Sequence, residues 1–317
     1  MQRVQVINKK PYTSRDRLLK DRRSYILKLN AIVPSNSYLI SAAIPSEISY
    51  NIEEYIMNEI SKIKSRNIDI NDNYIQNVIR NIRQLQKSQS RNIFPKVDET
   101  YFIPGSSIKG AVRSRIEYKF MPKEGKSMSC YIVEDDFNPR YAINHIKFWG
   151  ERVAISRWRC NPMRDNNICI VCDMFGSQLI SSLVNFGDAY MIEGDVERLN
   201  EFNGLEAVKP NSRFELEVTC FNFDHIRLGL LFLGFELFSK SPIILGMFKY
   251  KYNPNITDKL FRGKYAIGLL RFELKEIIDD LEEHHSLDKI IQETNNALKN
   301  SEFNEYINWD VGVIKDY

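Results

Sequence analysis

The chain has 317 residues, of which 43% are hydrophobic and 27% are charged, and its formal net charge is +3. This composition predicts a globular protein of one large domain or two small ones with a real core. No run approaches the ~18 to 20 apolar residues that span a bilayer, and the N-terminus lacks the apolar centre of a secretory signal. We therefore expect a soluble protein with a cytoplasmic location.

Charge is unevenly distributed along the chain. Residues 1–25 carry eight Lys and Arg against two Asp, whereas residues 271–317 carry twelve Asp and Glu against five Lys and Arg. The basic end could meet a polyanion and the acidic end would repel it. Solvated surface is the plainer interpretation of both ends.

The expected elements, in chain order, begin after a basic arm over residues 1–24. Alternation predicts a strand over 25–33, and apolar spacing predicts amphipathic helices over 52–64 and 74–86. A third helix begins within FIPGSSIKGAVRSR, residues 102–115, and runs to Phe120. The region from 121 to 183 lacks long periodic runs.

Regular patterns return in the second half of the chain. We expect paired strands over 183–192 and 212–221, joined by a polar connection, and then a buried helix over 224–240 with Asp224 at its N-cap. A last strand is expected over 264–274. Residues 275–317 should form an acidic amphipathic helix and tail on the outside, with Ile277, Ile278, Leu281, Ile290 and Ile291 as its apolar residues.

The order strand, helix, strand, strand, helix, strand predicts an α+β protein with a ferredoxin-like (RRM-like) βαββαβ core. We assign that core to 25–34, 101–120 and 183–274, within a single domain over 1–317. The remaining segments are a basic arm over 1–24, a helical insertion over 44–98, a zinc-binding insertion over 121–182, and the acidic helix and tail over 275–317.

The start of the third helix predicts an anion site. Pro104 and Gly105 form a turn, Ser106 or Ser107 can cap the helix, and the free N–H groups of the first turn attract negative charge. Lys109 and Arg113 lie four residues apart, so we expect them on one exposed face that extends this site. A capped helix with a basic surface is an equally good reading of these residues alone.

Three cysteines are typical of a metal site. Cys169 and Cys172 form a CxxC, and Cys160 lies nine residues earlier. A tetrahedral zinc site needs a fourth ligand, for which we favour His145 over Cys130. A set with three thiolates predicts structural zinc rather than a catalytic ion. Buried free thiols are the alternative, and Cys220, in an expected strand, is assigned to the core.

Little in the sequence supports catalysis. His225, His284 and His285 have no neighbouring catalytic motif, and Asp135, Asp136 and Asp188 have the spacing of ordinary loop acids. A Walker-type phosphate loop and a dinucleotide-binding motif are both absent. The sequence therefore assigns no catalytic residue.

The segment FIPGSSIKGAVRSR resembles the signature of the RAMP superfamily, the ferredoxin-fold RNA-binding subunits of type III CRISPR effector complexes. Four further stretches resemble that family in its own order: CIVCDMFGS, NFGDAY, EAVKPNSRFELEV and GKYAIGLLRFEL. Together these matches lie between residues 102 and 274. The resemblance implies a subunit that holds CRISPR guide RNA, faces target RNA, and packs beside other RAMP subunits in antiviral defence.

By position, the resemblance implies that Cys160, Cys169 and Cys172 hold a structural zinc ion. It also implies that the guide-RNA backbone is contacted by Gly105, Ser106, Ser107, Lys109 and Arg113. Subunits of the family that cut target RNA carry an Asp in a glycine-containing loop after the first strand. The corresponding stretch here, VPSNSYLISAAIPSEISY, has neither residue type. A non-catalytic subunit, present once or at a filament end, is therefore expected.

Two other functions remain open from the sequence. One is a metal-dependent endoribonuclease subunit that uses Asp69 or Asp72 to cut target RNA. The other is a free-standing zinc-containing RNA-binding protein, which would bind RNA without partner subunits.

Overall fold

The structure is a computed structural model of the whole chain. It describes residues 2–40, 50–66, 71–89, 93–130, 153–155, 160–162, 166–177, 179–199, 205–246, 265–281 and 283–309. Within these ranges, no helix has the length and apolar character that crossing a membrane requires.

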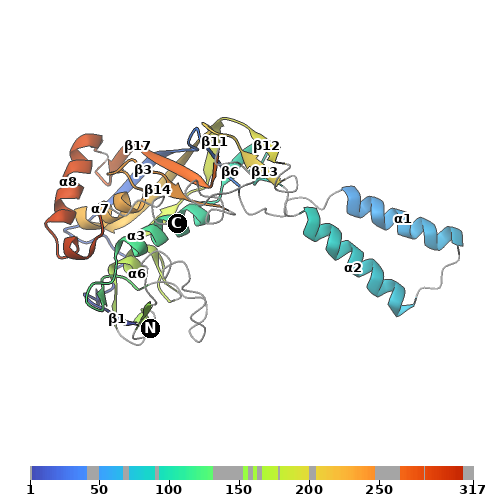
Figure 1. Cartoon of the computed structure of the whole chain (residues 1–317). Helices are drawn as coiled ribbons and strands as arrows, with labels where there is room; N and C mark the ends of the chain where they lie inside the picture. The colour runs from blue at the N-terminus through green and yellow to red at the C-terminus, as the bar shows by residue number, and fades with distance from the viewer. Residues whose placement is uncertain are drawn as a thin grey trace.

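A curled antiparallel sheet forms the body of the molecule (Figure 1). Its strands, in spatial order, are β15 (Ile243–Ile244), β17 (Leu269–Asp279), β3 (Arg23–Ile32), β14 (Arg213–Phe223), β11 (Ala189–Glu193), β6 (Thr100–Ile103) and β5 (Lys96–Val97). A further short strand, β10 (Val184–Phe186), also pairs with β14. The predicted pairing of 183–192 with 212–221 is confirmed, although the first strand is divided at Gly187 and Asp188.

Three helices cover the sheet: α3 (Gly105–Lys119), α7 (His225–Gly234) and α8 (Leu287–Lys299). The stripe of Ile108, Val112 and Ile116 on α3, which has the spacing of one helix face, is fully buried. It packs so closely on α7 that a Cβ on Gly234 would lie 2.8 Å from Val112 Cγ1. Asp224 caps α7 as predicted, because its carboxylate accepts the Arg227 N–H at 2.7 Å.

Two segments differ from the sequence prediction. Ile277 and Ile278 lie in strand β17, not in a helix, because β17 pairs with β3 as far as Asp279. This pairing joins residues about 250 positions apart, so no local pattern reveals it. The connection between β11 and β14 was expected to be a polar link, yet it contains a paired hairpin, β12 (Val196–Leu199) and β13 (Leu205–Val208).

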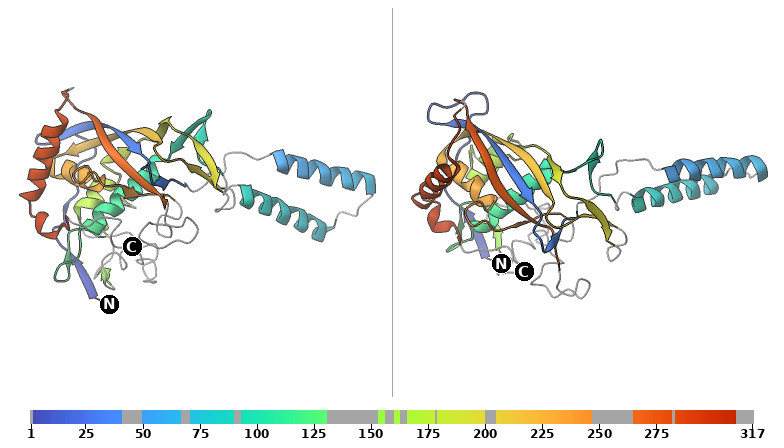
Figure 2. Two further views of the ribbon diagram at one scale, coloured as in Figure 1. Left: turned by 45° about the horizontal axis from the view of Figure 1, so that its top comes forward. Right: turned by 90° about the horizontal axis from the view of Figure 1, so that it is seen from above.

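Helices α1 (Tyr50–Arg66) and α2 (Asp72–Gln89) form where two amphipathic helices were predicted, and they project from the body in every view (Figures 1 and 2). They pack against each other, with Asn81 Nδ2 donating to the Tyr55 hydroxyl at 3.0 Å. Several of their apolar side chains stay exposed, Met57 at 64%.

The basic arm is folded onto the region that contains the cysteines. Strand β1 (Gln2–Val6) pairs in parallel with β7 (Lys126–Ser127) and β8 (Val153–Ile155), and β2 (Lys10–Pro11) pairs with β9 (Asn167–Ile168). The remaining short elements are β4 (Ser37–Tyr38), which pairs with β16 (Ala266–Ile267), the helix α6 (Ile170–Phe175) and the 3₁₀ turn η3 (Asn304–Tyr306).

Candidate functional site

Helix α3 begins directly after strand β6, with Pro104 as its N-cap. The Pro104 carbonyl accepts the Ser107 N–H at 2.9 Å. The prediction that Ser106 or Ser107 caps the helix is wrong, since no side chain of the helix start makes a capping bond and both serines are exposed. Asp188 instead accepts the Gly105 N–H at 2.8 Å. A carboxylate from a distant segment thus satisfies one of the free N–H groups.

Gly105 is the point of contact between two of the motifs. A Cβ at this position would lie 2.3 Å from the Phe186 carbonyl oxygen and 2.4 Å from that of Gly187. Only glycine lets the helix start approach the NFGDAY segment so closely. The two segments, in which Gly105 and Asp188 are 83 residues apart, therefore fix each other's position.

The exposed start of α3 presents four residues to solvent, which we call the α3 surface: Ser106, Ser107, Lys109 and Gly110. Lys109 is half-buried, and no carboxylate pairs with it among the residues that the structure describes. Burial, followed by repulsion from Arg113, lowers the pKa of Lys109. Space is open in front of Gly110, where a Cβ would meet no atom within 4 Å. A partly desolvated cation that lacks a paired carboxylate favours an anion.

Arg113 does not share that exposed surface. Its side chain is buried and donates from Nε to Glu117 at 2.9 Å, from Nη1 to the Gly176 carbonyl at 2.8 Å, and from Nη2 to Cys172 Sγ at 3.5 Å. The expectation of one exposed basic face for Lys109 and Arg113 is therefore wrong. Packing of α6 against α3 covers the side of the helix from which Arg113 extends.

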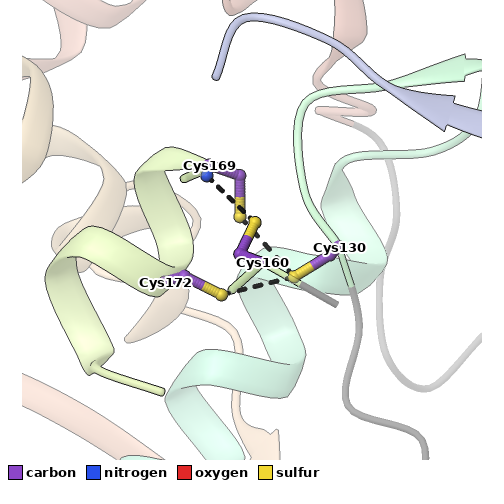
Figure 3. Close-up of side chains that lie close together, drawn as sticks. All are labelled: Cys130, Cys160, Cys169 and Cys172. Carbon is purple, nitrogen blue, oxygen red and sulfur yellow. Dashed lines mark hydrogen bonds between the residues drawn. The ribbon is translucent and has the colours of Figure 1, made fainter. Parts of the chain in front are cut away.

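Four buried cysteines meet beside α3 (Figure 3). Cys169 precedes α6, Cys172 lies within it, and Cys130 and Cys160 come from separate segments. Their sulfur atoms all lie within 4.8 Å of one another, with Cys130 and Cys172 at 3.3 Å, and no disulfide joins them. Hydrogen bonds with the other three cysteines hold the pKa of the Cys169 thiol well below its ordinary value, whereas the pKa values of Cys130 and Cys172 are raised.

This donor set fits a tetrahedral thiophilic ion. Zn–S bonds of about 2.3 Å place the sulfurs of a tetrathiolate site ~3.8 Å apart, and four thiolates favour zinc among common divalent ions. Cys130, the alternative fourth ligand in the sequence prediction, lies with Cys160, Cys169 and Cys172. His145, the preferred one, lies outside the described residues.

A buried carboxylate anchors α6 to the rest of the molecule. Asp173 accepts the Thr13 hydroxyl at 2.6 Å, Arg15 Nη1 at 2.7 Å and Arg227 Nη2 at 2.8 Å. Burial raises the pKa of Asp173, but these donors outweigh it and the pKa is lowered. Arg15 of the basic arm is therefore used inside the fold. No spacing in the sequence pointed to this network.

The other residues considered from the sequence lie away from the α3 surface and the cysteine cluster or outside the described residues. Cys220 is buried in β14, and burial raises the pKa of its thiol. His284 and His285 contact Glu276 and Asp279, at 3.0 and 3.3 Å. His225 is exposed directly after the Asp224 cap, and Asp72 begins α2. Three acids, Asp69, Asp135 and Asp136, lie outside the described residues.

Comparison with known proteins identifies the family. A family model described as the RAMP superfamily matches residues 87–307, well over half of the chain. Among solved structures, the chain is similar to one from "Crystal structure of Csm3-Csm4 subcomplex in the type III-A CRISPR-Cas interference complex", with 13% identity and a TM-score of 0.35, over 88% of this chain and 98% of that one. Comparison with curated proteins gives no match. On the family model, the chain belongs to the RAMP superfamily.

Proposed function

We propose that this protein is a guide-RNA-binding structural subunit of a type III CRISPR ribonucleoprotein. In this role it holds the backbone of the CRISPR RNA and packs against related RAMP subunits along it, facing target RNA. Membership of the RAMP superfamily and the chemistry of the α3 surface support the proposal. The four-cysteine cluster supports structural zinc as the cofactor.

One observation carries the RNA-binding role: Lys109 is half-buried beside the start of α3 without a carboxylate partner among the described residues. Burial has removed part of the hydration of this ammonium group, and a bound phosphate would replace that hydration with a charged hydrogen-bond acceptor. Ser106 and Ser107 add exposed hydroxyl donors, and Gly105 and Gly110 keep side chains out of the way of an approaching backbone. Arg113 would support this surface from behind.

The test is Lys109→Ala, measured as affinity for single-stranded RNA over a range of salt concentrations. We expect weaker binding for every RNA sequence, and a salt slope reduced by about 0.7 for the loss of one phosphate contact. Lys289→Ala on α8 is the matched control, because Lys289 is 75% exposed and lies on another helix. Unchanged affinity in Lys109→Ala, or a loss confined to certain sequences, would contradict backbone binding at α3.

We also propose a ferredoxin-like core. The strand order β17-β3-β14-β11 and the placement of α3 and α7 between strands support a split βαβ arrangement. In this assignment the cysteine region is an insertion held together by zinc, and α1 with α2 is a second insertion. Co-purification from the host with related subunits and a short RNA would support the assembly. A stable monomer that binds RNA alone would favour the free-standing alternative.

A further inference from the structure

Arg113 lies between the α3 surface and the cysteine cluster. It is four residues from Lys109 on the same helix, and its three donors point toward Glu117, Gly176 and Cys172. The contact with Cys172 Sγ is the feature that RNA binding does not explain. A buried guanidinium N–H 3.5 Å from a buried sulfur would stabilise negative charge on that sulfur, as on a metal-bound thiolate.

We propose that Arg113 is a positioning residue of the metal site: it donates an N–H to the metal-bound Cys172 thiolate and locks α3 to α6. This inference rests on the zinc site proposed above. A zinc ion with four thiolates leaves two negative charges in a buried place, and a guanidinium beside one thiolate offsets part of that charge. Glu117 holds the planar guanidinium in the orientation that the sulfur requires.

The second contact of Arg113 strengthens this interpretation. Gly176, which ends α6, has a φ of +83° and donates its N–H to the Cys172 carbonyl at 3.0 Å. Arg113 therefore binds both the Cys172 side chain and the carbonyl of Gly176, the residue whose N–H closes the same helical turn. Loss of the metal would loosen that turn, and Arg113 would transmit the change to α3.

The experiment compares three purified full-length variants: Arg113→Met, Arg113→Lys and Arg115→Met. Arg115 is the matched control, since it lies two residues later on α3, is also buried, and pairs with Glu236 instead. Zinc affinity is measured by competition with a chromophoric chelator. We expect Arg113→Met to lower it 10- to 100-fold, the usual effect of removing an outer-shell partner. Arg113→Lys should recover part of the loss, and Arg115→Met should leave zinc affinity unchanged.

Cobalt substitution gives a readout that a general loss of stability would not change. Removal of an N–H···S bond should shift the thiolate-to-cobalt charge-transfer band in Arg113→Met and not in Arg115→Met. Equal zinc affinity and equal cobalt spectra in wild type and Arg113→Met would overturn the proposal. A wild-type protein that binds neither metal would also overturn it, while leaving the RNA role of Lys109 to its own test.

Discussion

Gly105 and Gly110 lie in the same helix, five residues apart, yet replacing each by alanine should change stability in opposite directions. At Gly105 the added Cβ would lie 2.3 Å from one backbone oxygen and 2.4 Å from another. Backbone atoms cannot avoid the clash by changing rotamer as a side chain can. Strand β10, the NFGD turn or α3 must therefore move. Overpacking of this kind costs about 1–3 kcal/mol and sometimes more, and we expect at least about 3 kcal/mol here.

At Gly110 the added Cβ would meet nothing within 4 Å. Alanine inside a helix is then more stable than glycine by about 0.5–1 kcal/mol. The same open space should matter for RNA, because the methyl group would occupy the α3 surface. Gly110→Ala should therefore be a more stable protein that binds RNA more weakly.

Urea unfolding, followed by far-UV circular dichroism, measures both effects. With a slope of about 3 kcal/mol/M, Gly105→Ala should lower the unfolding midpoint by about 1 M, and Gly110→Ala should raise it by about 0.2–0.3 M. A Gly105→Ala protein as stable as wild type would refute the close approach of α3 to the NFGD turn. A Gly110→Ala protein that loses stability would refute the open space in front of that residue.

Two further predictions concern the cysteine region. Because the pKa of Asp173 is lowered, its stabilising effect is present above its unfolded pKa and is lost as the pH falls through the folded value. Asp173→Asn should lose about 3–5 kcal/mol near pH 7, because it removes the carboxylate shared by Arg15 and Arg227 and leaves Arg227 with Asp224 as its one carboxylate partner among the described residues. The variant should also show a flatter fall in urea midpoint below about pH 4. Elemental analysis should find about one zinc per chain in wild type and in Cys220→Ser, and clearly less in Cys130→Ser; equal zinc in both variants would exclude Cys130 as a ligand.

Local patterns were sufficient for most helices and for the central strands. The apolar stripe of α3 and the alternation of β14 are properties of neighbouring residues, and both elements form where their periodicity predicted. The Asp224 cap was also readable, because a cap and its N–H partner lie within one turn. The boundary between β17 and α8 could not be predicted from local patterns, because the pairing of β17 with β3 determines where the strand ends.

The helix start at the PGSS segment, the metal-ligand spacing of three cysteines and the resemblance of the motifs to the RAMP superfamily could all be read from the sequence. The surroundings of each side chain on that helix depend on long-range packing. Spacing places Lys109 and Arg113 one turn apart, but α6, about 60 residues later, covers Arg113 and leaves Lys109 beside open solvent. Likewise, Cys130 joins the other three cysteines through long-range folding. Helical periodicity is a local property, whereas burial of one side of a helix depends on which distant segment packs against it.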